Sequence, residues 1–265
     1  MQILKRYLRK DLSKEFIVNQ AGEALHSDCI NHCLLYAFGE CNHKHLSVCN
    51  NCNSFFELFD NIQNSVNADL QPTIKEYQKK LTYFMGHHAR KTYLNAQLRA
   101  NLAKLCPEEA LFIVDYKMRI LPRNAWETKS EFYGKRGWTL HSVLVYSKDV
   151  ENENLKIDAY DHWSDDTKQD AWFTASSLHA VLEVMDPKPK KITIISDNGP
   201  HYHNTELMII LSKWKEWYDV NVNIWIFLEA GEAKTPIDSH HATVNMIFTY
   251  LQFFFIFCAI LIFNL

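Results

Sequence analysis

The chain has 265 residues, enough for one good hydrophobic core with room for a small extra module. Hydrophobic residues make up 47% of it and charged residues 22%, which is the composition of a globular protein and excludes a disordered one. The net charge of −3 gives no overall basic signal for nucleic acid, so any contact with DNA must use local patches.

The seven cysteines are unevenly placed along the chain. Five fall between Cys29 and Cys52, and the other two are Cys106 and Cys258. This clustering argues against the disulfide framework of a secreted fold. The first residues are basic but lack the apolar segment and cleavage site of a signal peptide, so we expect a reducing compartment, the cytosol or the nucleus.

The first hundred residues predict a mainly helical region. Residues 1–25 are polar and helical in pattern, residues 26–60 hold most of the cysteines, and residues 61–106 carry apolar side chains at helical spacing. We therefore expect an N-terminal Cys/His region over residues 1–60, followed by a helical connector over residues 61–106.

The Cys/His cluster in this region predicts a structural zinc site. The ligand set with the best spacing, C-x3-H-x3-C-x2-C, is formed by Cys41, His45, Cys49 and Cys52. Thiolate and imidazole ligands suit Zn²⁺ in a closed tetrahedral site. Further candidates are His43, which could replace the predicted histidine, and Cys29, His32 and Cys33. Those last three could supply a second site, exchange into the first, or form a helix face of small apolar thiols.

After Pro107 the pattern changes to that of a mixed α/β domain. Strands are predicted over residues 110–121, 137–146, 155–163, 191–196 and 220–228, and helices over 170–185, 204–218 and from about 236 onward. Three consecutive strands predict an antiparallel meander, and the remaining strands need helical crossovers and hence parallel pairing. The predicted core, of β-β-β-α-β-α-β-α order, spans residues 107–245.

Three aspartates in this core form a candidate site. Asp115 lies inside the first strand, where a charged residue is costly to bury. Asp197 follows the fourth strand, at the edge where open α/β sheets bind ligands, although Asp-Asn-Gly also makes turns. Asp238 opens the last helix, where an acid also suits the helix N-terminus. If the first and fourth strands are neighbours, the three carboxylates converge and favour two Mg²⁺ or Mn²⁺ ions.

This arrangement resembles the ribonuclease H-like catalytic core of DDE/DDD transposases and retroviral-type integrases. The pieces that carry the resemblance are FIVDYKM around Asp115, ISDNGPHYHN around Asp197 and EAGEAKTPIDSHHATV around Asp238. The resemblance covers roughly residues 110–245. It implies cleavage and joining of DNA strands in the nucleus, with the three aspartates as catalytic metal ligands and a homo-oligomer as a further expectation.

The third acid has alternatives in the same segment. Glu232, and after it Glu229, stand at positions that also suit the resembled family. His240 and His241 follow on the same helix turn, where they either orient substrate or water or belong to a solvated face.

Two short basic stretches are candidates for contact with DNA phosphates. Arg90 and Lys91 lie in the helical connector, and Lys135 and Arg136 lie between the first two strands. A solvated helix face is the competing interpretation of the first pair.

Residues 246–265 form an apolar tail without charge. Its length and polarity are those of a transmembrane helix, but no Lys or Arg flanks it after Lys234. It is a membrane anchor, a buried helix that continues the fold, or an aberrant terminus. Cores of the resembled family continue past the third acid, so the resemblance implies a truncated or decayed member.

Three functions follow from these observations. The first is metal-dependent phosphoryl transfer on DNA. The second is a catalytically inactive, zinc-binding protein that contacts DNA or another protein. The third is a protein held at a membrane by its apolar tail.

Overall fold

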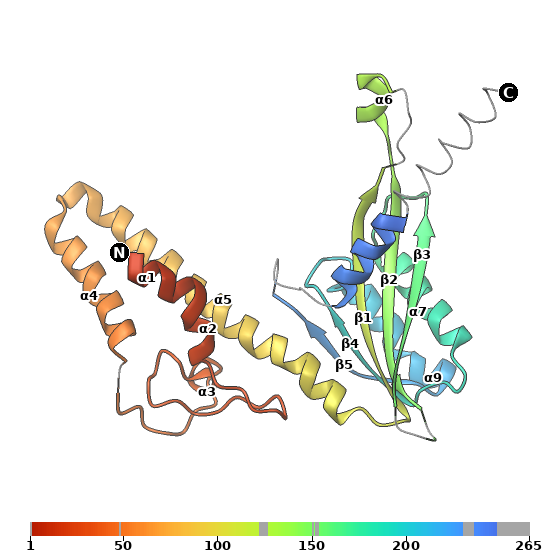
Figure 1. Ribbon diagram of the computed structural model, residues 1–265, viewed down its shortest axis with the longest axis horizontal. Coiled ribbons are helices and arrows are strands. Elements are labelled where there is room, and N and C mark those ends of the chain that lie inside the picture. The colour runs from red at the N-terminus through yellow and green to blue at the C-terminus, as the bar shows by residue number, and fades with distance from the viewer. Residues whose placement is uncertain are drawn as a thin grey trace. The chain divides into compact units, whose positions relative to one another are not determined.

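The computed structural model divides the chain into two compact units, Met1–Lys104 and Leu105–Leu265. We call them the N-terminal unit and the α/β unit (Figure 1). The structure describes residues 2–47, 49–121, 127–149, 151, 154–229 and 236–247. The Cys/His region and the helical connector thus belong to the same unit.

The N-terminal unit is helical with one irregular Cys/His-rich stretch. Its helices are α1 (Gln2–Arg6), the π-helical turn η1 (Tyr7–Asp11), α2 (Leu12–Glu15), α3 (Leu34–Ala37), α4 (Asn50–Ser65), the 3-10 turn η2 (Ala68–Leu70) and α5 (Gln71–Lys104). A small apolar cluster joins the first helices to α3 and α5 through the buried residues Tyr7, Leu12, Phe16, Leu34 and Ala89. A core of this size leaves much of the irregular stretch to be held by other interactions.

The α/β unit is built on a five-stranded mixed sheet. Its strands are β1 (Glu109–Ile120), β2 (Trp138–Lys148), β3 (Leu155–Ser164), β4 (Lys191–Ser196) and β5 (Asn221–Phe227), in the order β3-β2-β1-β4-β5. β1, β2 and β3 pair antiparallel, whereas β4 pairs parallel with both β1 and β5. The predicted meander, the parallel remainder and the neighbouring first and fourth strands are therefore confirmed.

Helices cover both faces of this sheet (Figure 1). One face packs on α7 (Ala171–Val184), α8 (Thr205–Ser212) and α9 (Trp214–Tyr218), which bury alternate apolar residues of the strands, among them Phe112 and Val114. The other face carries a helix over residues 236–247, the dark blue helix in the figure. Because strand residues alternate between faces, Asp115 belongs to this second face.

Two helical features differ from the sequence prediction. The single helix expected over residues 204–218 is interrupted at Lys213 and forms α8 and α9. The Ser212 hydroxyl donates a 2.7 Å hydrogen bond to the Ile209 carbonyl, a local bond that competes with the helical pattern. In addition, a short helix α6 (Lys129–Gly134), begun by a capping box at Thr128 and Glu131, lies between the first two strands.

Within the described part of the chain, every helix is too short or too polar to span a membrane. Met246 and Ile247 belong to the helix over residues 236–247 and are exposed. The expectations for the rest of the apolar tail concern residues 248–265, which lie outside the described residues.

Candidate functional site

The parallel register of β1 and β4 brings Asp115 and Asp197 level with each other. The last pair in this register is Ile113 with Ile195, and each aspartate lies two residues beyond it. β4 ends at Ser196, whereas β1 continues alongside β2. The two carboxylates therefore lie at the carboxyl edge of the parallel strands, as predicted.

The turn after β4 holds Asp197 in place. Its Oδ1 atom accepts a 2.9 Å hydrogen bond from the N–H group of Gly199 and lies 3.4 Å from Nε2 of His201. The His201 ring lowers the pKa of Asp197 more than burial raises it, and the Gly199 N–H group lowers it further. The Asp-Asn-Gly turn and an ionised carboxylate thus occur together.

The helix over residues 236–247 brings two further groups to this edge. Nδ1 of His241 lies 3.6 Å from Oδ2 of Asp115, and the Lys117 ammonium donates a 3.2 Å hydrogen bond to the His241 carbonyl. Asp238 lies in the first turn of the helix and is exposed. β1, the turn after β4 and the helix over residues 236–247, which are far apart in sequence, thus meet at this edge of the sheet.

The pKa of Asp115 is raised by its burial and by the charges of the other two predicted acids. Burial, and after it the charges of Asp197 and Asp238, raise it from an ordinary value of 3.8 to about 7. The pKa of His241 falls to about 4, chiefly through burial, so its ring is neutral at neutral pH. Its Nε2 atom is buried and has no hydrogen-bond partner among the described residues. An incoming cation would relieve the repulsion between the carboxylates.

Sequence reasoning missed one acid on the same face. Asp115, Ser142 and Asp161 are directly opposite one another on β1, β2 and β3. The Ser142 hydroxyl donates to Asp161, whose Oδ1 lies 2.9 Å from Nε2 of His240. The alternation along the third strand could have placed Asp161 on one face, but only the cross-strand register aligns it with Asp115.

The three predicted acids converge without forming one tight cluster. Groups of three or more ligand atoms that all lie within 4.8 Å of one another occur, in the described part of the chain, only among cysteines and histidines, in two groups. Of the alternative acids, Glu229 follows β5 and is partly buried, and Glu232 lies outside the described residues.

The N-terminal unit contains these two Cys/His groups, each compatible with a zinc site. The first Cys/His group is formed by His26, Cys33, Cys41 and His45, and the second by Cys29, His32, Cys49 and Cys52. The predicted ligand set is therefore divided, with its first two residues in one group and its last two in the other. His26 was not predicted at all, and His43 belongs to neither group, although its ring centroid lies 4.8 Å from that of His26.

The N-terminal ends of two helices position two of the thiols. Cys33 precedes α3 and its sulfur accepts the N–H of Tyr36 at 3.4 Å, while Cys49 precedes α4 and its sulfur accepts the N–H of Cys52 at 3.3 Å. Burial raises the pKa of Cys52 to about 12 and lowers that of His32. A bound cation would lower the pKa of the Cys52 thiol again and offset the cost of burying its thiolate, because metal coordination deprotonates a thiol.

The predicted DNA contacts differ in exposure. Arg90 and Arg136 are exposed, and Lys91 is partly buried. Lys135 forms an ion pair with Glu127 in which both side chains are largely buried. That pairing makes Lys135 the weakest of the four candidates.

Comparison with protein families finds one match. A family model described as a domain of unknown function (DUF8701) matches residues 92–249, which include the whole sheet and all three predicted acids. Comparison with curated proteins gives no match.

Proposed function

We propose a function from the residues of the site, because the chain belongs to the DUF8701 family, whose description assigns no activity. We propose that it is a transposase-like or integrase-like protein with a ribonuclease H-like core. In this proposal it acts in the nucleus and catalyses divalent-metal-dependent phosphoryl transfer on DNA. Asp115, Asp197 and Asp238 are its catalytic acids.

The observation that carries the proposal is the position of Asp115 in the sheet. A carboxylate inside an apolar strand lies level with Asp197, and its pKa is raised by burial and by the charges of Asp197 and Asp238. Such repulsion costs stability unless a cation is present, and hard carboxylate oxygens suit Mg²⁺ or Mn²⁺. The three acids do not all lie within 4.8 Å of one another, which is compatible with ligands shared between two ions.

Two divalent ions held there would supply an activated water or 3′-hydroxyl and neutralise charge at the leaving oxygen of a phosphodiester. The chain's own residues orient the acids. The Gly199 N–H group holds Oδ1 of Asp197, and the His201 ring lies 3.4 Å from the same atom. The neutral His241 ring stands beside Asp115, and Asp238 presents its carboxylate from the exposed first turn of the same helix.

The test is cleavage of duplex DNA by the full chain in Mn²⁺ or Mg²⁺. We expect strand breaks that require the divalent ion and that are reduced at least a hundredfold in Asp115→Asn and in Asp197→Asn. The matched control is Asp158→Asn, which removes a carboxylate three residues along β3 from Asp161 and paired with Lys156. Calorimetric titration with Mn²⁺ should show the same pattern of loss.

Cleavage that persists in Asp115→Asn, or the absence of Mn²⁺ binding by the unaltered chain, would overturn the proposal. The second of these outcomes, combined with retained DNA binding, would favour a catalytically inactive zinc-binding interaction protein.

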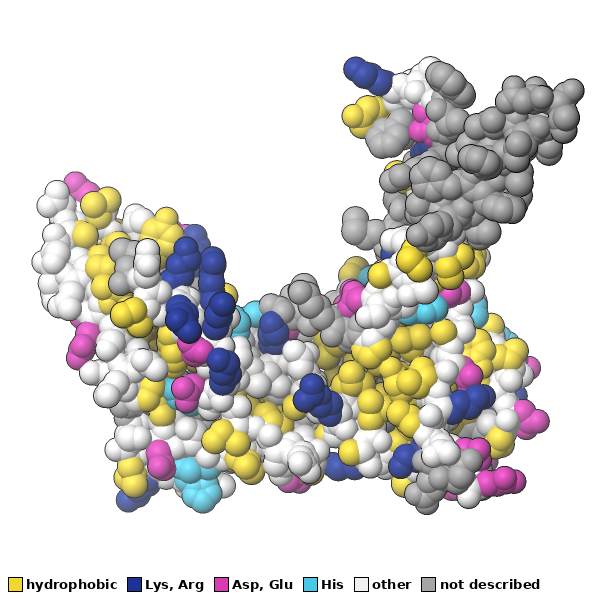
Figure 2. All heavy atoms as spheres, in the orientation of Figure 1, with side chains coloured by type: hydrophobic (Ala, Val, Ile, Leu, Met, Phe, Trp, Pro, Cys, Tyr) yellow, Lys and Arg dark blue, Asp and Glu magenta, His cyan; other side chains and the backbone are white. Residues whose placement is uncertain are grey.

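A specific observation favours that second candidate. Lys5, Arg6, Arg9 and Lys10 are exposed on α1 and η1, and Figure 2 shows Lys and Arg side chains gathered over this part of the N-terminal unit. A basic helical surface next to two Cys/His groups can bind DNA phosphates without any catalysis.

A further inference from the structure

The cysteines and histidines of the two Cys/His groups are interleaved along the chain. The order is His26, Cys29, His32, Cys33, Cys41, His45, Cys49 and Cys52, of which the first, fourth, fifth and sixth belong to the first group. Each group therefore draws one pair of residues from before α3 or at its start and another pair from after it. Neither group can form from a local stretch of chain.

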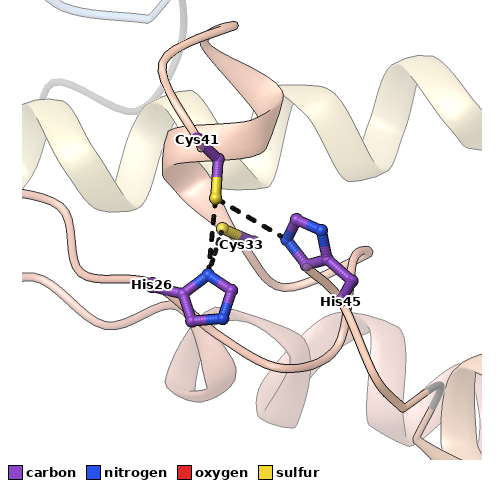
Figure 3. Close-up of side chains that lie close together, drawn as sticks. All are labelled: His26, Cys33, Cys41 and His45. Carbon is purple, nitrogen blue, oxygen red and sulfur yellow. Dashed lines mark hydrogen bonds between the residues drawn. The ribbon is translucent and has the colours of Figure 1, made fainter. Parts of the chain in front are cut away.

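In the first Cys/His group, the side chains point toward a common centre (Figure 3). Nδ1 of His26 lies 3.7 Å from Sγ of Cys33 and 3.4 Å from Sγ of Cys41, and Nε2 of His45 lies 4.0 Å from the Cys41 sulfur. The other ring nitrogen of His26 lies 3.6 Å from the Asp28 carboxylate. A carboxylate on the far side of a histidine ring is the usual companion of a metal ligand, because it orients the ring.

The second Cys/His group has three cysteines and one histidine and is more buried. Nε2 of His32 lies 3.3 Å from Sγ of Cys52 and 4.0 Å from Sγ of Cys49. The Cys29 sulfur accepts the N–H group of Cys49 at 3.4 Å, which draws the two halves of the group together. Tyr7 places its hydroxyl 2.7 Å from the same His32 nitrogen.

These distances, 3.3–4.0 Å, are close to the edges of a zinc tetrahedron. Bonds of about 2.0–2.3 Å to nitrogen and sulfur give ligand-to-ligand distances of roughly 3.3–3.8 Å. In the first group two thiolates and two neutral imidazoles cancel the charge of Zn²⁺, and the second group supplies the Cys₃His ligand set that structural zinc sites also use. From this geometry we infer that the N-terminal unit binds two zinc ions, one in each Cys/His group.

The interleaved order of the ligands couples the two sites. His32 and Cys33 are consecutive residues but ligate different ions, so the backbone between them is held from both sides. Emptying one site frees this backbone and the chain around Cys41 and Cys49, and so disturbs the ligands of the other. The two ions then stabilise a region in which few apolar side chains are buried. The inference concerns the N-terminal unit alone and does not depend on the proposed activity of the α/β unit.

The experiment is native mass spectrometry of the full chain, purified under reducing conditions with zinc. We expect two zinc ions per chain in the unaltered protein and in two controls. His43→Ala removes a histidine of the same loop that lies in neither group, and Cys106→Ser removes a cysteine outside them. Cys33→Ser and Cys52→Ser should each lower the content below two and weaken binding of the remaining zinc at least tenfold.

A second measurement needs no variant and so holds even if the altered proteins do not fold. Replacement of zinc by Co²⁺ should give two equivalents of a tetrahedral spectrum with thiolate charge-transfer bands. One equivalent of metal per chain, or disulfides among the five cysteines of this region, would overturn the inference. Full affinity of the second site in Cys33→Ser would overturn the coupling between the sites.

Discussion

His241 and Asp115 meet at a distance of 3.6 Å between Nδ1 and Oδ2, although one lies on the last described helix and the other in the middle of β1. Asp115 is also level with Asp197 in the parallel register of β1 and β4. The helix over residues 236–247 therefore contacts the sheet at the edge where the two aspartates lie. The predictions for Gly199 and Asp115 concern this edge of the sheet.

Gly199 lies where the turn after β4 leaves no room for a side chain. A Cβ atom there would be 2.4 Å from Cε1 of His201 and 3.0 Å from Oδ1 of Asp197. We expect Gly199→Ala to displace one of these side chains and to weaken Mn²⁺ binding at least tenfold. The control is Gly134→Ala, because a Cβ at Gly134 would meet nothing within 4 Å. Equal Mn²⁺ affinity in the two variants, measured by calorimetry, would contradict the assignment of Asp197 as a ligand.

Asp115 should make the metal-free α/β unit less stable as the pH rises. Its folded pKa of about 7 exceeds the ordinary value of 3.8, so its proton is held more tightly in the folded state. That stabilisation is complete below pH 3.8 and is lost as the pH rises through 7. Asp115→Asn, which cannot ionise, should therefore raise the free energy of unfolding by about 2 kcal/mol at pH 8 and very little at pH 4, after allowance for partial exposure.

Tryptophan fluorescence can follow this change, because all seven tryptophans lie in the α/β unit. Added Mn²⁺ should stabilise the unaltered protein at pH 8 but not Asp115→Asn. A stability difference between the two proteins that does not vary with pH would exclude this role for the buried carboxylate.

His141 should have the opposite effect on acid stability. Its ring is fully buried and its Nε2 lies 3.0 Å from the Tyr202 hydroxyl, and burial holds its pKa well below 6.5. Below pH 6.5 the imidazole of His141 binds a proton in the unfolded chain but not in the folded one. The free energy of unfolding therefore falls as the pH drops below this value.

We expect His141→Leu to reduce that loss between pH 6.5 and 5, as measured by urea unfolding at each pH. At pH 7.5 it should cost about 1–3 kcal/mol, because the buried Tyr202 hydroxyl loses its partner. His179→Leu is the control, since His179 forms a similar pair with Tyr218 at the surface. An unchanged slope in His141→Leu would mean that other groups dominate the acid response.

Tyr7 should support the second zinc site from outside its ligand set. Its hydroxyl lies 2.7 Å from the His32 nitrogen and 3.8 Å from the Cys52 sulfur, so once that nitrogen binds metal the sulfur is its remaining acceptor. Tyr7→Phe should lower zinc affinity about tenfold in competition with a chromophoric chelator. Tyr77→Phe, on an exposed part of α5, should leave the affinity unchanged, and a parallel fall in both would point to a general loss of stability.

The sequence predicted most of the α/β unit because its signals are local. Apolar runs bounded by turn residues define the strands, and β4 was predicted with both of its ends correct. Asp115 stood out because an acid inside an apolar strand is costly wherever the strand pairs. The break at Lys213 was missed because it depends on one serine hydroxyl bonding to the backbone.

The grouping of the cysteines and histidines could not be obtained in the same way. Spacing identifies residues that can bind metal, but the same eight side chains can be divided in many ways. His32 and Cys33 are adjacent in sequence and belong to different groups, which only the path of the chain around α3 decides. The place of Asp161 could not be predicted from spacing either, because its alignment with Asp115 depends on the register of three strands.

By itself, then, the sequence determined which segments are strands and helices, and which residues have side chains capable of binding metal. Those properties depend on hydrophobic periodicity and on residue chemistry, which act over a few neighbouring positions. The tertiary structure decided which of those side chains share a site. Register, crossover and loop path join residues as distant as Asp115 and His241, and contacts at that separation leave no periodic trace in the chain.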